Sequence, residues 1–107
     1  MTEPEKELLS LLTEDYYGLW EVEVWLPVGR DTLREIVSSL LRQQLIEWFT
    51  REDDSANAVA LSELTETPPS LEDPTAWVWP GRSERQYLLA TTEAGENVYF
   101  GSAVPAR

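Results

Sequence analysis

The middle of this chain changes its apolar spacing from that of a helix to that of a strand without a break. Between residues 32 and 45 the apolar side chains recur at intervals of three and four, and they are Leu33, Ile36, Val37, Leu40, Leu41 and Leu45. Over residues 45–51 the period becomes two. Because each period fits only one kind of backbone, the switch predicts a helix over 32–44 that passes directly into a strand over 45–51. Thr32 and Glu35 have the spacing of a capping box at the start of this helix. An α+β fold is therefore expected.

Two helices are expected before this segment. Thr2 and Glu5 have the spacing of a capping box, and a stripe of leucines follows, so a first helix is predicted over about residues 3–14. Residues 16–26 allow two interpretations, because their apolar positions fit both the alternation of a strand and one side of a helix. The context of the neighbouring elements favours a helix, and Pro27 ends the segment in either case.

The C-terminal half is expected to complete a hairpin. Residues 52–85 lack regular patterning, apart from leucines that suit a short helical turn, namely Leu61, Leu64 and Leu71. Residues 87–92 alternate again and are predicted to pair with 45–51 as the second strand. Thr92 is suited to cap a last short helix. The chain is therefore expected to form a single domain over 1–107, with a long insertion at about 52–85.

The composition excludes several classes of site. The 107 residues include 20 acidic and 8 basic ones, no histidine and no cysteine, for a formal net charge of -12. Without histidine or cysteine, no disulfide, zinc site of the usual kind, cysteine nucleophile or histidine base can form. Neither a calcium-loop spacing nor a glycine-rich phosphate loop occurs. We therefore expect no catalytic residue, no metal and no cofactor, and the chain is predicted not to be an enzyme.

The acidic residues are concentrated in two blocks. Residues 1–28 and 52–73 each hold seven acids and between them a single lysine, whereas 29–51 is nearly neutral. Such surfaces keep a small domain soluble and repel nucleic acid. No apolar run approaches the roughly 18 residues of a membrane span, and the acidic N-terminus does not resemble a signal peptide. We therefore expect no membrane partner, and the cytoplasm is the default location.

The order of the expected elements resembles that of the winged-helix superfamily. The segment Leu33–Val37, continuing into Leu45–Glu47, looks like a third helix that feeds the first strand of the wing. The segment Tyr87–Glu96 resembles the second wing strand and the threonine-to-glycine turn that opens the next helix. The resemblance implies three N-terminal helices, a two-stranded antiparallel wing with a long inserted loop, and a short C-terminal helix. Gln44 stands where the family usually has a helix-ending glycine, and the long insertion and acidic charge also depart from the family pattern.

The resemblance implies that the outer face of 32–44 enters the major groove of DNA. Side chains on that face would then contact base edges or phosphates, and arginines at its entrance and before the second strand would hold backbone phosphates. The candidate DNA-binding residues are Arg30, Arg34, Ser38, Arg42, Arg82 and Arg85. Acidic residues are interleaved with these arginines, so the alternative is that they form ion pairs on a solvated face.

Five tryptophans are a high count for a chain of this length. Trp20 and Trp48 are expected in the core. Trp25, Trp77 and Trp79 are candidates for a partner-binding patch, because tryptophan buries a large area at small entropic cost. The alternative for the last two is that their proline-bounded segment folds back and covers the core.

These features lead to two hypotheses about function. The first is a small, non-enzymatic, acidic winged-helix protein that binds another protein, with an immunity-type or antitoxin-type inhibitor as one concrete version. Its acidic surface would suit a basic partner, because opposite charges steer association. The alternative is a DNA-binding transcriptional regulator that uses the 32–44 helix and forms a homodimer with one domain per half-site.

Overall fold

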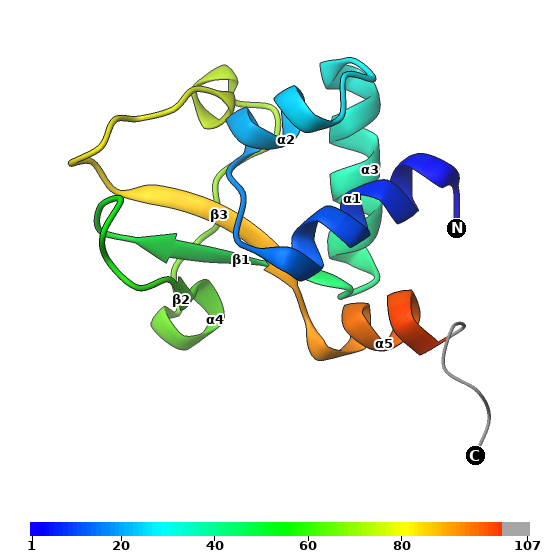
Figure 1. Ribbon diagram of the computed structural model, residues 1–107. Helices are drawn as coiled ribbons and strands as arrows, with labels where there is room; N and C mark the ends of the chain where they lie inside the picture. The colour runs from blue at the N-terminus through cyan, green and yellow to red at the C-terminus, as the bar shows by residue number, and fades with distance from the viewer. Residues whose placement is uncertain (102–107) are drawn as a thin grey trace.

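Three helices form the N-terminal half of the protein, and the computed structural model describes residues 1–101. These helices are α1 (Glu3–Glu14), α2 (Leu19–Trp25) and α3 (Arg30–Arg42) (Figure 1). The predicted first helix is confirmed together with its capping box. The Glu5 amide donates to Thr2 Oγ1 at 3.3 Å, and the Glu5 carboxylate accepts from the Thr2 amide at 2.9 Å.

The segment that allowed two interpretations is helical over α2. Leu19, Val22 and Leu26 are all buried, so the helical spacing is the one that the core uses. Just before α2, Tyr17 is extended and pairs with Leu89, each backbone N–H donating to the other's carbonyl at 3.0 and 2.7 Å. The residues of the strand-like pattern are therefore helical, and only Tyr17, which precedes them, pairs as a strand residue does.

α3 begins two residues earlier than predicted. Gly29 is its N-cap, with φ 94°, and the Gly29 carbonyl accepts from the Leu33 amide at 3.0 Å. Thr32 and Glu35 therefore lie inside the helix, and the capping box predicted for them is wrong. Glycine adopts this φ without steric strain, which allows the chain to turn sharply into α3.

A single left-handed residue joins α3 to the strand β1 (Ile46–Arg51). Gln44 has φ 59°, its amide donates to the Leu41 carbonyl, and the Leu45 amide donates to the Leu40 carbonyl, both at 3.0 Å. This is a Schellman motif, whose left-handed position is usually glycine. Leu40 and Leu45 are both buried, which adds the apolar contact typical of the motif. The predicted switch from helix to strand is confirmed.

The predicted hairpin is also confirmed, but its sheet has three strands. β1 pairs antiparallel with β3 (Gln86–Thr91), in a register that sets Ile46 opposite Thr91. β2 (Val59–Ala60) pairs with the other edge of β1, so the expected two-stranded wing is wrong. A strand of two residues is too short to produce an alternating pattern, which explains why the sequence did not indicate it. The fold is of the expected α+β class.

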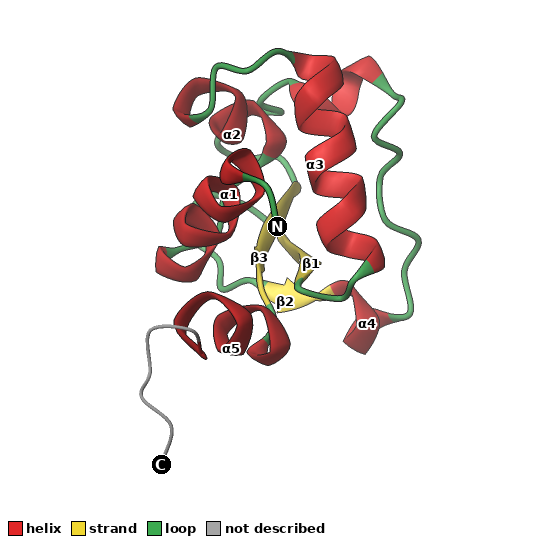
Figure 2. Ribbon diagram, turned by 90° about the vertical axis from the view of Figure 1, so that its right-hand side faces the viewer, coloured by secondary structure: helices red, strands yellow, loops and turns green. Residues whose placement is uncertain are grey.

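The insertion between β1 and β3 folds back over the core. It contains β2, α4 (Leu61–Leu64) and the short 3-10 helix η1 (Pro74–Trp77), and between α4 and η1 the chain runs beside α3 (Figure 2). Trp77 is 3% exposed, and its indole N–H donates to the Leu71 carbonyl at 3.0 Å. Because η1 packs against α2, Trp77 is a core residue, and its assignment to an exposed patch is wrong.

The last helix, α5 (Glu93–Gly101), packs against α1. Its predicted cap is confirmed, since Thr92 Oγ1 accepts from the Gly95 amide at 3.0 Å. Gly95 is buried against the backbone of Leu45, and a Cβ atom at this position would lie 1.9 Å from the Leu45 carbonyl oxygen. Glycine is therefore required for α5 to approach the end of α3 this closely.

The left-handed turn after α3 provides a test of this description. We expect Gln44→Gly to raise the free energy of unfolding by about 0.5–1 kcal/mol, because glycine relieves the strain of a side chain in the left-handed region. Gln43, which has a helical backbone, is the matched control, and Gln43→Gly should instead destabilise the protein. Urea denaturation measures both. Destabilisation by Gln44→Gly equal to that of the control would contradict the left-handed assignment.

The close approach of α5 provides a second test. Gly95→Ala is expected to lower the free energy of unfolding by about 2 kcal/mol or more, because the added methyl group overlaps the Leu45 carbonyl. Gly101→Ala is the control, since no atom lies within 4 Å of its Cβ position. That variant should stay within about 0.5 kcal/mol of the wild type in the same thermal and urea measurements. Equal stability of the two variants would mean that α5 does not dock on Leu45.

Candidate functional site

The outer face of α3 carries three of the candidate DNA-binding residues. Arg34, Ser38 and Arg42 line one shallow hollow, and three carboxylates from Asp31, Glu35 and Glu72 line it with them. Arg34 lies 3.2 Å from Asp31 and 3.8 Å from Glu72, which the folded-back insertion brings to this face. Acids therefore outnumber arginines in the hollow.

The other candidate DNA-binding residues lie elsewhere. Arg30 forms two hydrogen bonds with Glu23, at 2.9 and 3.0 Å, and its guanidinium lies 5.2 Å from the centre of the Trp77 ring. Arg82 is exposed in the turn before β3, where it lines a hollow with Asp53 and Asp54.

Arg85 is held in place by hydrogen bonds from all three of its guanidinium nitrogens. Nη1 donates to Glu66 at 2.8 Å, Nη2 also donates to Glu66, and Nε donates to Thr50 Oγ1 at 3.0 Å. The hydrogen bonds from Arg85 lower the pKa of Glu66 below its ordinary value of 4.5. Arg85 is therefore occupied within the fold.

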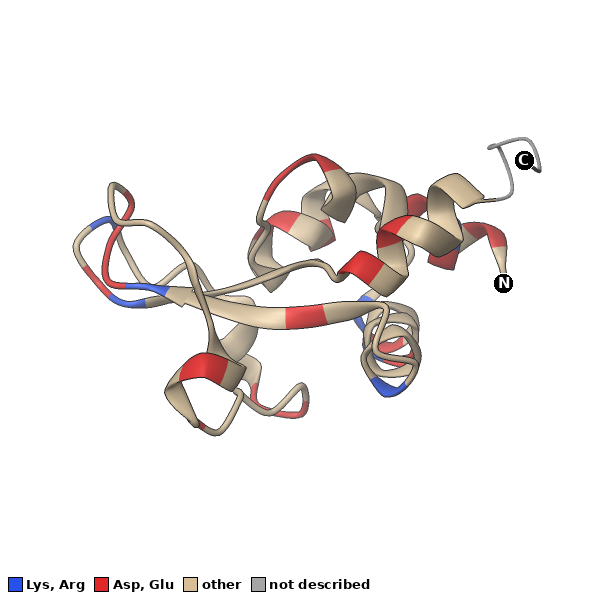
Figure 3. Ribbon diagram, turned by 90° about the horizontal axis from the view of Figure 1, so that it is seen from below, with Lys and Arg blue, Asp and Glu red and all other residues tan. Residues whose placement is uncertain are grey.

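The basic side chains do not form one positive face. Figure 3 shows Arg positions divided between α3 and the far end of the β1–β3 hairpin, with Asp and Glu among them, and the lysine, Lys6, lies on α1. Among the seven basic residues in the described part of the chain, five lie within 4.0 Å of a carboxylate, namely Lys6, Arg30, Arg34, Arg51 and Arg85. Most of the candidate DNA-binding arginines therefore form ion pairs with carboxylates, as the alternative interpretation of the sequence predicts.

An open groove lined by aromatic side chains lies between α2, the end of η1 and β3. Trp20, Trp79 and Tyr87 contribute their rings, Pro69 and Pro80 contribute rigid walls, and the volume is about 620 Å³. The groove is completed by Asp73, Thr75, Ala76, Val78 and Arg85. We call this feature the aromatic groove.

The three candidate tryptophans have different environments. Trp79 is half exposed and lines the aromatic groove, whereas Trp77 is buried in the core. Trp25 is exposed on the outer side of α2 and does not line the groove. Trp48 is in the core as expected, whereas Trp20 is only partly buried and belongs to the groove. Trp20 and Tyr87 were not predicted as groove residues from the sequence, although the prolines around Trp79 indicate an ordered loop.

A second hollow adjoins the aromatic groove. Trp20 and Trp79 line both, and the second hollow also contains Glu21, Asp54 and Arg51. Arg51 lies 3.8 Å from Asp54, and its Nε atom donates to the buried side chain of Gln86 at 2.8 Å. The side-chain charge within this hollow is therefore negative by one unit. We call it the acidic hollow.

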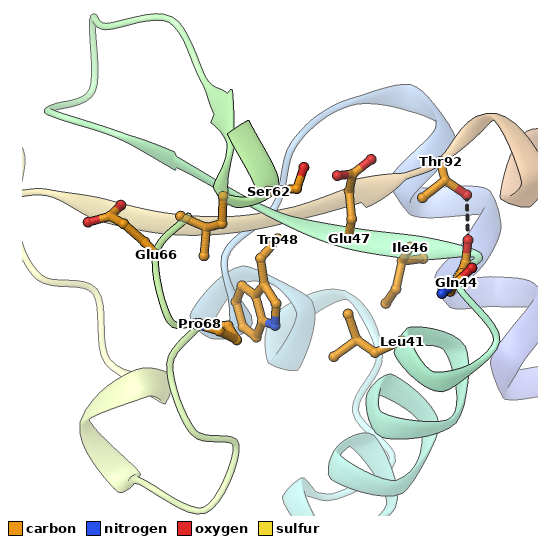
Figure 4. Close-up of a pocket in the computed structure, with 10 residues that line it drawn as sticks. Leu41, Gln44, Ile46, Glu47, Trp48, Ser62, Glu66, Pro68 and Thr92 are labelled. Carbon is orange, nitrogen blue, oxygen red and sulfur yellow. Dashed lines mark hydrogen bonds between the residues drawn. The ribbon is translucent and has the colours of Figure 1, made fainter. Parts of the chain in front are cut away.

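A separate apolar recess lies between α3, α4 and β1, with a volume of about 400 Å³ (Figure 4). Leu41, Ile46 and Trp48 form its floor, and Pro68 lies at its edge beside the tryptophan. The recess exposes the edge of the core, and of its two carboxylates, Glu47 and Glu66, the second is already bound by Arg85. None of the candidate binding residues predicted from the sequence lines this recess.

The Arg85–Glu66 pair predicts a specific pH dependence. Because the pKa of Glu66 is lowered in the folded state, its contribution to stability is present at neutral pH and is lost as the pH falls below about 4.5. Glu66→Gln should therefore be less stable than the wild type at neutral pH and lose less stability on acidification. The control is Glu63→Gln, an exposed acid of α4, which should follow the wild-type profile. Parallel profiles for Glu66→Gln and the wild type, measured by urea denaturation, would contradict the pairing.

Comparisons with known proteins leave the function to be inferred from these features. Within the described residues there is no cluster of three or more side chains suited to hold a metal ion, and none of the helices is long and apolar enough to cross a membrane. No model of a known protein family matches this chain, and neither curated proteins nor solved structures gave a match.

Proposed function

We propose that this chain is a non-enzymatic winged-helix domain that acts by binding another protein through the side of α2 and the segment after η1. The observation that carries the proposal is a set of large apolar side chains that are more than half exposed there. They are Val24 at 76%, Trp25 at 63%, Val78 at 61% and Trp79 at 51%. Apolar surface of this kind is typical of binding sites, and tryptophan is enriched among the residues that dominate binding energy.

The order of the elements supports the winged-helix architecture. Three helices lead into β1, the hairpin of β1 and β3 follows, and Tyr17 between α1 and α2 pairs with the free edge of β3. The third strand and the folded-back insertion are additions to this plan. They do not interrupt the contact between α3 and the hairpin.

The charge of the chain favours a basic partner. A net charge of -12 creates a negative potential that attracts a positively charged protein and accelerates its association. Exposed tryptophans would then fix the complex after the encounter. An inhibitor of a basic toxin, of the immunity or antitoxin type, is one concrete form of this function.

DNA binding through α3 is the second candidate. The observation in its favour is that Arg34, Ser38 and Arg42 converge on one hollow. Two facts oppose DNA binding through α3. Glu72 of the insertion lies close to Arg34, and its negative charge would repel DNA phosphates. Phosphate contacts also require basic side chains that are not already paired with carboxylates. Arg42 and Arg82 are the only basic residues in the described part of the chain without a carboxylate within 4.0 Å.

Substitution of the exposed apolar residues tests the first candidate. The immobilised protein should retain a partner from cells of its source organism in a saturable, salt-sensitive manner, and the double variant Trp25→Ser/Trp79→Ser should retain at least about tenfold less. Val98→Ser, on the exposed side of α5, is the matched control and should behave as the wild type. Equal retention by the wild type and the double variant would contradict the proposal.

Fluorescence anisotropy with labelled random duplex DNA tests the second candidate. We expect no binding at low salt, about 50 mM, where phosphate contacts are strongest. Salt-dependent binding that is lost in Arg34→Gln/Arg42→Gln would instead favour the regulator. A circular dichroism spectrum unchanged from the wild type would establish that this variant is folded.

A further inference from the structure

We propose that the aromatic groove binds a proline-rich segment of the partner in the polyproline II conformation, with a basic residue of that segment in the acidic hollow. This inference rests on the proposed function and specifies which part of the partner the domain recognises. It is carried by the rings, the hydrogen-bond donors and the charge of the two adjoining sites.

The rings of the groove suit a proline-rich ligand. Trp20, Trp79 and Tyr87 come from three separate elements and stand around one open space with Pro69 and Pro80. Proline rings pack well on flat aromatic faces, and grooves lined by aromatic residues are a recurring way to bind polyproline II segments. Such a segment is already extended before binding, so that it loses little conformational entropy.

Three residues that line the groove carry hydrogen-bond donors of the kind that an extended backbone needs. Within the described residues, the indole N–H groups of Trp20 and Trp79 and the hydroxyl of Tyr87 have no hydrogen-bond partner, whereas the indole of Trp77 bonds to Leu71. A polyproline II segment makes no internal hydrogen bonds, so its carbonyl groups can accept from these donors. The carbonyl groups of an α-helix are mostly occupied within the helix, and for this reason we favour the extended conformation.

The walls of the groove are held in place without a ligand. Asp73 caps η1 by accepting from the Thr75 amide at 3.0 Å, and the buried Trp77 anchors the same turn. On the opposite wall, the Arg85 guanidinium is fixed by Glu66 and lies 5.3 Å from the centre of the Tyr87 ring. A site that is ordered in advance loses less entropy when the ligand binds.

The acidic hollow specifies the charge of the ligand. It shares Trp20 and Trp79 with the groove, so a segment lying across these two rings passes from one site to the other. Asp54 and Gln86 already engage the only basic residue in the hollow, Arg51. The carboxylate of Glu21, which accepts from the Gly18 amide at 3.0 Å, has capacity for further hydrogen bonds from an arginine or lysine.

Three synthetic peptides test the inference with the isotope-labelled full chain, in which the five tryptophan indole N–H signals are resolved by NMR. The probe is octaproline with an arginine at each end. One control peptide has a glutamate at each end, and the other keeps the arginines but replaces the prolines with a flexible Gly-Ser repeat. We expect the probe to bind at least about tenfold more tightly than either control, with shifts of the Trp20 and Trp79 signals and none of the Trp48 signal.

Variants identify the binding surface. Trp79→Ala should weaken binding of the probe at least about tenfold, whereas Phe100→Ala, an exposed aromatic residue of α5 outside the groove, should leave it unchanged. Glu21→Gln keeps the hydrogen bond to Gly18 and should reduce the preference for arginine over glutamate ends.

Equal binding of all three peptides, shifts confined to other tryptophans, or no shift at millimolar probe would overturn the inference. If the probe fails while Trp25→Ser/Trp79→Ser still abolishes capture of the partner, only this inference is lost and the proposed function stands.

Discussion

The burial of Trp77 is the interaction on which the arrangement of the surface depends. Its indole ring lies in the core under the guanidinium of Arg30, and its N–H group bonds to the carbonyl of Leu71, six residues earlier. Burial of this ring, together with that of Leu61, offsets part of the entropy lost by ordering a long insertion that has little regular structure of its own. Trp77 thereby fixes η1 against α2, and this contact sets the wall of the aromatic groove that includes Trp79.

The folded-back insertion also changes the charge on the outer face of α3. Because the chain between α4 and η1 returns beside α3, Glu72 lies next to Arg34 on the face that a DNA-binding helix would need (Figure 2). Exposed ion pairs contribute little to stability, but they neutralise charge that phosphates would otherwise meet. The insertion thus places acidic side chains on one candidate surface and contributes the lining of another.

The elements with strong periodicity could be predicted from the sequence, and those set by long-range contacts could not. The helices around Leu8 and Leu40, the strands β1 and β3 and the cap at Thr92 each have a local pattern that indicates their structure. The start of α3 at Gly29 and the short strand β2 have no such pattern. For the site, the count of tryptophans indicated an aromatic surface. Which indole is buried depends on how residues 68–80 fold back, and no local rule determines that.

Hydrogen exchange of the five tryptophan indole N–H groups, measured by NMR, tests the central role of Trp77 most directly. We predict that the Trp77 indole proton exchanges far more slowly than those of Trp25 and Trp79, because it is buried and hydrogen-bonded to Leu71. Exchange of the Trp77 proton as fast as that of the exposed Trp25 would contradict it, since the insertion would then not be anchored and the aromatic groove would not be formed.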